Sequence, residues 1–242
     1  MVTLFDPTVV LGVNHTGTRL LVDILDVMGS DPGRVDNQWR EEEGFLAIHH
    51  WLMGQVHDQG WTEAIFDMDF VASFQDDKRF VDEMRERTRH AVEQGFASPY
   101  ASPWHWKCPT ALLFLPSWLE VFPNACFVHI EREPVAVAES LLRRREVLRL
   151  ADGERFYDLM NQRVLDCAPS MDRYVRVPYE AVEEHLTQIA VAARLDASEA
   201  TLAKAKALIR SGEKPLWNAR RSLLGNCWEI LTRLRAAMRR RN

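Results

Sequence analysis

Residues 8–21 read TVVLGVNHTGTRLL, a stretch in which a strand, a loop and the start of a helix follow one another. The run from Val9 to Val13 is rich in β-branched residues and predicts a buried strand. A small polar loop follows, and apolar residues at helical spacing begin at Leu20. A strand, a tight loop and a helix start can hold an anion, because the loop amides and the positive end of the helix meet at one point. We therefore expect residues 12–19 to bind a phosphate group.

The residue types in the loop suit an anion but not ATP hydrolysis. Gly17 allows the backbone to approach a ligand closely, Thr16 and Thr18 offer hydroxyl donors, and Arg19 adds a permanent cation. Gly12 and Gly17 have the spacing of a nucleotide phosphate loop. Kinases and ATPases continue that loop with Lys and then Ser or Thr, which this chain lacks. The sequence therefore predicts nucleotide binding without the lysine that kinase chemistry requires.

A second strand-to-helix connection repeats this arrangement later in the chain. Residues 125–130 read ACFVHI and predict a buried strand, which Pro134 ends before a helix begins at Val135. Arg132 follows the strand, and Ser140 lies eight residues after it.

Together the two connections resemble the sulfotransferases that use PAPS (3′-phosphoadenosine-5′-phosphosulfate), whose second motif reads Arg-x-Pro followed by five residues and Ser. The resemblance runs over most of residues 8–195 and includes Lys107-Cys108-Pro109, Phe122-Pro123 and Tyr179-Glu180. It implies a P-loop-like fold and sulfuryl transfer from PAPS to a hydroxyl or amine, without a metal. The residues implied in donor binding are His15, Thr16, Gly17, Thr18 and Arg19 for the 5′-phosphosulfate, Arg132 and Ser140 for the 3′-phosphate, Tyr179 near the adenosine, and Arg210 in a late loop.

The resemblance leaves the general base open between two residues. Several bacterial members carry Asn, then Glu, then Phe four residues later, and Asn37, Glu41 and Phe45 fit that pattern. His105 is the second candidate, because the ordinary pKa of histidine suits proton transfer near neutral pH. Lys107 stands where a cation would stabilise charge on the transferring sulfuryl group.

His15 departs from the family pattern. It occupies the loop position where these enzymes usually carry Lys or Arg. Either His15 is protonated beside the donor, or Arg19 and Lys107 supply the positive charge during catalysis.

Composition limits the remaining classes of function. The 242 residues suit a single domain, and the region from Lys204 to the end has a net charge of +9 within a chain of −5. A basic C-terminal helical segment, about residues 204–242, leaves a peripheral membrane contact open, but no apolar run is long enough to span a bilayer. The four cysteines are widely spaced, which indicates reduced thiols and no zinc motif, so we expect a cytoplasmic protein. No patch of basic and aromatic residues predicts nucleic-acid binding.

The alternation of strands and helices predicts an α/β fold: a central parallel sheet with helices on both faces, in a three-layer sandwich. Ligands of such folds bind at the carboxyl ends of the strands, which would bring the two connections together. The sequence favours a sulfotransferase acting on a small-molecule, glycan or lipid acceptor. A kinase-like phosphoryl-transfer enzyme and a non-catalytic nucleotide-binding protein remain as alternatives, and neither the acceptor nor the oligomeric state can be derived.

Overall fold

The computed structural model describes residues 6–35, 40–57, 65–97, 99 and 102–211. The chain divides into two compact units, residues 1–207 and 208–242. The predicted basic helical segment lies mostly outside the described residues, so it stays a prediction.

A four-stranded parallel sheet forms the centre of the first unit. Its strands are β1 (Thr8–Leu11), β2 (His105–Lys107), β3 (Cys126–Glu131) and β4 (Arg173–Pro178), in the order β2-β1-β3-β4. Strand β1 pairs with β2 and β3, and its Val10 lies opposite Lys107 on one side and Val128 on the other. Strand β4 is an edge strand that ends at Pro178, a position that needs no ladder hydrogen bond from proline.

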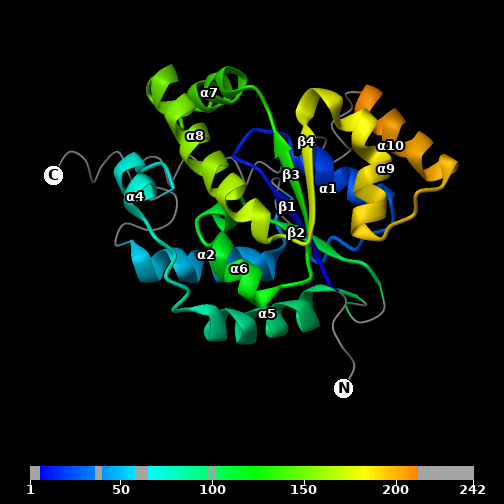
Figure 1. The fold of residues 1–242 in the computed structure, drawn as a ribbon, viewed down its shortest axis with the longest axis horizontal. Helices are drawn as coiled ribbons and strands as arrows, with labels where there is room; N and C mark the ends of the chain where they lie inside the picture. Colours follow the sequence, from blue (N-terminus) through cyan, green and yellow to red (C-terminus); the bar gives the residue numbers. More distant parts are fainter. Residues whose placement is uncertain (1–5, 36–39, 58–64, 98, 100–101, 212–242) are drawn as a thin grey trace, which may run out of the picture. The chain divides into compact units, whose positions relative to one another are not determined.

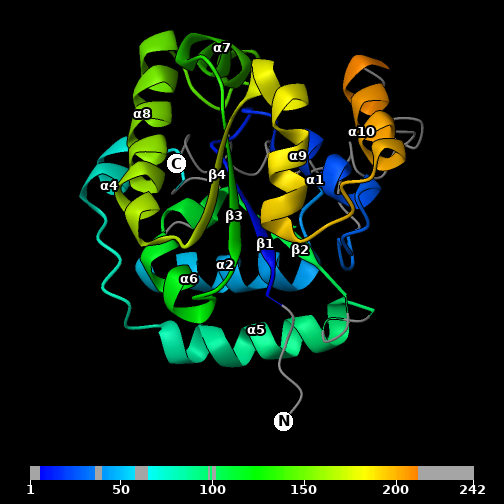
Figure 2. The same cartoon turned by 45° about the vertical axis from the view of Figure 1, so that its right-hand side comes forward.

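Helices cover both faces of this sheet, as Figures 1 and 2 show. The α-helices are α1 (Thr18–Val27), α2 (Glu43–Val56), α4 (Met68–Ser73), α5 (Val81–Gly95), α6 (Leu115–Val121), α7 (Pro134–Arg143), α8 (Leu150–Cys167), α9 (Val182–Ala193) and α10 (Glu199–Ser211). Short 3₁₀ helices occupy Pro109–Leu112, Ala168–Ser170 and Tyr179–Ala181. In Figure 2 the sheet separates α8 from α1 and α9.

Burial on both faces explains the β-branched character of the strands. All four residues of β1 are buried, and Val9 and Leu11 join the larger apolar core that α2, α5, α6 and α8 share. A parallel sheet covered on both sides is expected to have continuous apolar strands. The predicted α/β fold with a central parallel sheet is therefore confirmed.

The sequence also allows a second strand to begin at Val35, but residues 36–39 lie outside the described residues, so that strand stays a prediction. The chain just before it forms a turn, in which the Asp31 carboxylate accepts a hydrogen bond from the Gly33 amide at 2.9 Å. Asp31 also makes an isolated bridge with Trp104.

Aromatic stacking fixes α2 against the sheet. The ring of Phe45 stacks on Trp106 of β2 with 4.4 Å between centroids and an interplanar angle of 8°. Trp118 of α6 packs beside both rings and donates a hydrogen bond to the buried His49 at 3.1 Å. This cluster sets the position of the chain immediately before α2, which carries Glu41.

Candidate active site

The strand order brings three loops to one edge of the sheet. The loops after β1, β3 and β4 leave from neighbouring strands, and β2 ends on the other side of β1. In an open parallel sheet, ligands bind at the carboxyl ends of the strands where the chain direction switches between faces. Here that point lies at β1 and β3.

The phosphate loop is a tight turn closed by its own hydrogen bonds. The amide and the hydroxyl of Thr16 both donate to the Val13 carbonyl, at 3.1 Å and 2.8 Å. Gly17 then caps α1 in the left-handed region with φ 107°. Helix α1 has no acidic residue in its first turn, so the positive end of its dipole keeps its full attraction for an anion. The hydroxyl of Thr16 therefore shapes the loop, and its role in donor binding stays a prediction.

Arg132 and Tyr179 close over this loop from β3 and β4. The Arg132 guanidinium donates to the carbonyl of His15 at 3.4 Å and lies over the Tyr179 ring, with 4.7 Å from Cζ to the centroid. The same ring packs against Gly17, where a Cβ atom would come within 2.4 Å of it. Glycine is thus required at position 17 both by its φ and by the ring. The two connections that were predicted to come together therefore meet, and Tyr179 after β4 lies against both.

Further charges surround the loop. The Nε2 atom of His15 lies 3.0 Å from a carboxylate oxygen of Glu146, in the connection between α7 and α8. Burial, followed by the positive charge of Arg144, lowers the pKa of Arg19 in the first turn of α1. Cationic side chains therefore surround the loop, together with the carboxylates of Glu146 and Asp23.

Thr18, Ser140 and Arg210 are three further residues predicted to bind the donor. Thr18 begins α1 and is buried, and Ser140 lies in α7, two turns after Arg132. Arg210 lies in the last turn of α10 and in the second unit of the chain, rather than in a loop. The roles of all three stay predictions.

Lys107 and Glu41 form a buried ion pair on the β2 side of the loop. The Lys107 ammonium lies 3.0 Å from a Glu41 carboxylate oxygen, and the two side chains are only 4% and 7% exposed. Lys107 is the last residue of β2 and pairs with Val10, two residues before the phosphate loop begins at Gly12. The predicted electrostatic residue and the predicted base therefore lie together beside the loop. Asn37, which belonged to the same prediction, lies outside the described residues.

Arg40 anchors the segment that carries Glu41. Its guanidinium pairs with Asp26 and lies 3.2 Å from Asp23, both on α1. Arg40 has φ 60°, a left-handed conformation that is uncommon for a residue with a side chain. The anchor ties the chain before α2 to the helix that follows the phosphate loop.

His105 lies farther from the loops than Lys107. It starts β2 opposite Thr8, so it lies toward the amino ends of the strands. Its ring contacts the Ser30 hydroxyl at 2.9 Å and Asp26 at 3.3 Å, and burial, followed by the charge of Arg40, lowers its pKa to about 3. This placement favours Glu41 over His105 as the base.

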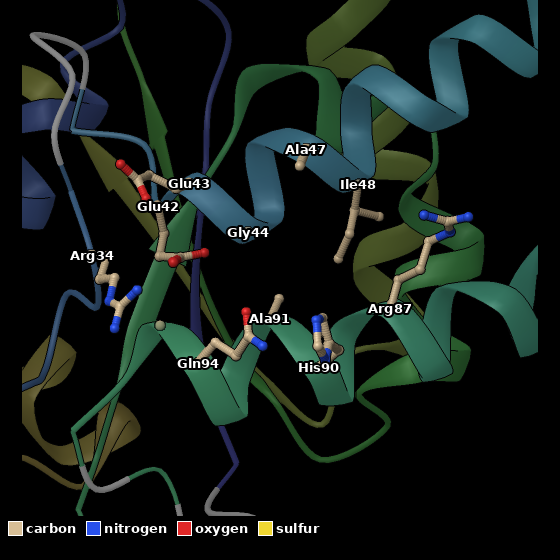
Figure 3. A pocket seen from close by; sticks show the side chains of 11 residues that line it. Arg34, Glu42, Glu43, Gly44, Ala47, Ile48, Arg87, His90, Ala91 and Gln94 are labelled. Carbon is tan, nitrogen blue, oxygen red and sulfur yellow. The ribbon is translucent and has the colours of Figure 1, made fainter.

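Glu42 lines a pocket of about 330 Å³ formed mainly by residues of α2 and α5, shown in Figure 3, and Glu41 is not among the lining residues. The Glu42 carboxylate caps α2 by accepting a hydrogen bond from the Phe45 amide at 2.9 Å. The residue is 2% exposed, and burial raises its pKa to about 7. Glu42 therefore has a structural role as a helix cap, whereas Glu41 pairs with Lys107.

The described residues contain no group of three or more His, Cys, Asp and Glu side chains arranged to hold a metal ion. Cys108, Cys126 and Cys167 are free thiols, and Cys227 lies outside the described residues. Within the described part of the chain, every helix is too short or too polar to cross a membrane.

Sequence reasoning missed two residues of this site, Arg40 and Glu146. Arg40 contacts Asp26, 14 positions earlier in the chain, and the pair of His15 and Glu146 spans 131 positions, so neither contact follows from local spacing. Glu146 follows three arginines, and a single acid in a basic run carried no signal for its partner.

Comparisons with known proteins agree with the geometry. A family model described as "Sulfotransferase family" matches residues 7–192. The sulfotransferase domain of the olefin synthase from Synechococcus PCC 7002 superposes with a TM-score of 0.55 and 21% identity, covering 92% of this chain and 85% of that one. Sulfotransferase STF9 from Mycobacterium avium has a TM-score of 0.52 and 19% identity, with 88% and 69% covered. None of the curated proteins matches the chain. At these identities the two structures support the fold.

Proposed function

Because the chain belongs to the sulfotransferase family, we propose that it moves a sulfuryl group from PAPS to a hydroxyl or amine of an acceptor. The observation that carries the proposal is the convergence of Arg132, Tyr179 and the phosphate loop at the ends of three strands. A cytoplasmic location belongs to the same proposal.

The residues around the loop fit a nucleotide that carries anionic groups at two positions. Among the described residues, the buried Nε atom of Arg132 has no hydrogen-bond partner, which leaves one strong donor available for a phosphate oxygen. Arg132 and Ser140 would hold the 3′-phosphate, while the loop from His15 to Arg19 would hold the 5′-phosphosulfate. Tyr179 offers an aromatic ring on the nucleotide side of the site.

The acceptor would bind on the β2 side, beside Lys107 and Glu41. The Glu41 carboxylate takes the proton of the acceptor hydroxyl as its oxygen bonds to sulfur, and the bond from sulfur to the bridging oxygen breaks. Adenosine 3′,5′-bisphosphate leaves with the bond's electron pair. Lys107 stabilises negative charge on the sulfuryl oxygens, and the low solvent exposure of the pair strengthens that attraction.

A thermal-shift experiment with adenosine 3′,5′-bisphosphate, compared with ATP and Mg²⁺, tests the proposal. Stabilisation by the bisphosphate and not by ATP is expected, because ligands that bind only the folded state raise its stability. Stabilisation by ATP alone would favour the kinase-like alternative.

Arg132→Ala tests the phosphate contact itself. Charge-assisted hydrogen bonds are worth about 1.5–3 kcal/mol, so affinity for adenosine 3′,5′-bisphosphate should fall about tenfold or more. Arg155→Ala is the matched control, since Arg155 is 57% exposed and pairs with Asp69 on α4, an element outside the site. Equal affinities in both folded variants would contradict the assignment.

A further inference from the structure

The contact between His15 and Glu146 pairs a side chain of the phosphate loop with an acid from a distant segment. The two side chains are 13% and 25% exposed, and 3.0 Å separates His15 Nε2 from the Glu146 oxygen. Arg132 holds the main chain of the same residue through its carbonyl. Both the backbone and the imidazole of His15 are thus held by the segment that runs from β3 through α7.

Two left-handed backbone positions shape this contact. His15 has φ 70°, and Arg145, next to Glu146, has φ 60°. Helix α7 ends at Arg143, and the chain leaves it through a left-handed cap, in which the Arg145 amide donates to the Leu142 carbonyl and the Glu146 amide donates to the Leu141 carbonyl, both at 3.0 Å. This cap fixes the direction in which Glu146 leaves the helix.

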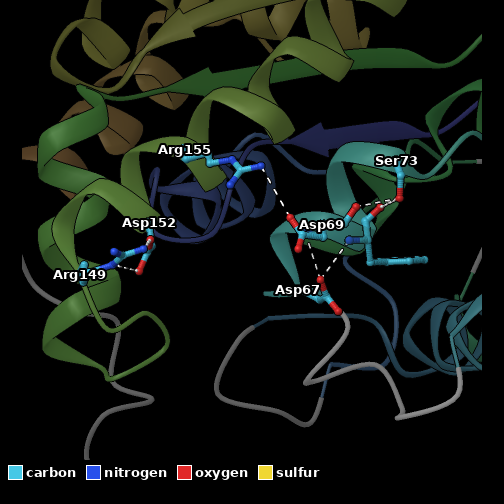
Figure 4. A network of polar contacts seen from close by, with 7 residues as sticks. Asp67, Asp69, Ser73, Arg149, Asp152 and Arg155 are labelled. Carbon is cyan, nitrogen blue, oxygen red and sulfur yellow. Dashed lines mark hydrogen bonds and ion pairs between the residues drawn. The ribbon is translucent and has the colours of Figure 1, made fainter.

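The segment is also fixed on its far side. Val147 is buried, and Arg149 at the start of α8 pairs with Asp152 through two hydrogen bonds of 3.0 Å and 2.6 Å, shown in Figure 4. Glu146 is therefore presented to His15 by a turn that is anchored at both ends.

We propose that Glu146 is a positioning residue that holds His15 as an imidazolium, with its second ring nitrogen directed at the 5′-group of the bound nucleotide. With Nε2 hydrogen-bonded to the carboxylate, Nδ1 is the nitrogen left to donate to the ligand, and a ring that donates from both nitrogens is positively charged. A carboxylate on one side and an anionic ligand on the other both stabilise that charge. The imidazolium of His15, held by this carboxylate, thus takes the place of the Lys or Arg that the resemblance leads one to expect at this position.

The other charged groups around His15 do not remove the need for Glu146. Arg132 contacts the His15 carbonyl, and Arg19 and Arg144 lie close enough to each other for their charges to interact. These cations repel a further positive charge on the imidazole. Glu146 opposes that repulsion, because its carboxylate contacts the ring directly. The inference rests on the proposed function, because it assigns the partner of His15 as the nucleotide's 5′-group.

The test compares nucleotides with and without that group. Glu146→Gln should weaken adenosine 3′,5′-bisphosphate about tenfold, the effect of losing one charge-assisted hydrogen bond, and leave adenosine 3′-monophosphate within about twofold. Glu139→Gln, on the exposed face of α7, removes the same charge and should leave both affinities within about twofold. In a His15→Lys background, Glu146→Gln should cause no loss, because lysine carries its own charge. Equal affinities of wild type and Glu146→Gln for the bisphosphate would overturn the inference.

A second measurement needs no nucleotide. The ring-nitrogen NMR signals of His15 in the free protein should change in Glu146→Gln and stay unchanged in Glu139→Gln. Unchanged His15 signals in Glu146→Gln would also overturn the inference. By contrast, failure of wild type to bind the bisphosphate, with Glu146-dependent His15 signals, would contradict the proposed function and leave the contact between the two side chains established.

Discussion

Glu42→Gln should make the protein more stable above neutral pH, although it removes a helix-capping carboxylate. The amide keeps an oxygen that can accept the Phe45 hydrogen bond, and the substitution removes only the buried charge. Glu42 is 2% exposed, and burial raises its pKa from the ordinary value of 4.5 to about 7. The amides of Phe45 and Gly44 lower that pKa, and the charge of Glu43 raises it, by smaller amounts.

The sign and size of the effect follow from this shift. A group whose pKa is raised in the folded state is protonated there at a pH where the unfolded chain has already lost its proton. Its contribution to stability is therefore complete below about pH 4.5 and is lost as the pH rises to about 7. At 1.36 kcal/mol for each pKa unit, the wild-type protein loses up to about 3 kcal/mol that the glutamine variant keeps.

Urea denaturation followed by tryptophan fluorescence measures this difference at about pH 5 and about pH 8, on either side of the shifted pKa. The stability gained by Glu42→Gln over wild type should increase from the lower to the higher pH. Glu43→Gln is the matched control, because the Glu43 side chain lies next to Glu42 in the sequence but is exposed. Its effect on the free energy of unfolding should be nearly the same at both pH values. A gain from Glu42→Gln that does not change with pH would refute the reasoning.

Three further substitutions test the site. Glu41→Gln should reduce steady-state turnover with the true acceptor about 10²–10⁴-fold, as expected for loss of a general base, while adenosine 3′,5′-bisphosphate still binds. Near-normal turnover would contradict the assignment of Glu41 and favour His105 as the base. Gly17→Ala places a methyl group 2.4 Å from the Tyr179 ring at φ 107°, so urea denaturation should show a loss of about 1–3 kcal/mol, and a neutral result would contradict the described packing. Arg40→Ala leaves two carboxylates of α1 without their cation, so we expect a loss of about 1–3 kcal/mol and weaker turnover with unchanged nucleotide affinity; unchanged stability would show that the anchor is unnecessary.

The meeting of the loops after β1, β3 and β4 was predictable from the sequence because its signals are local. A β-branched run before a glycine-containing loop specifies a strand and a helix start from neighbouring residues alone. Arg132 follows β3 directly, and Tyr179 follows β4, so their convergence with the loop required only that the strands be parallel and adjacent.

The choice between Glu41 and His105 depended on the tertiary structure. Both residues had reasonable chemistry, and His105 is two residues from Lys107 in the sequence. The register of β2 against β1 places His105 toward the amino ends of the strands, where burial lowers its pKa to about 3. Stacking of Phe45 on Trp106 fixes the start of α2. Glu41, just before this helix, therefore lies beside Lys107, although the two residues are 66 positions apart in the sequence.

The sequence by itself determined the fold class, the family and the two strand-to-helix connections, because periodicity and short motifs depend on residues close together in the chain. Only the tertiary structure decided which charges are paired: Glu41 with Lys107, Arg40 with α1, and Glu146 with His15. The reason is physical. The letter of a charged residue in the sequence is the same whether its side chain faces water, a ligand or an oppositely charged residue. Which of these it contacts depends on how distant segments pack.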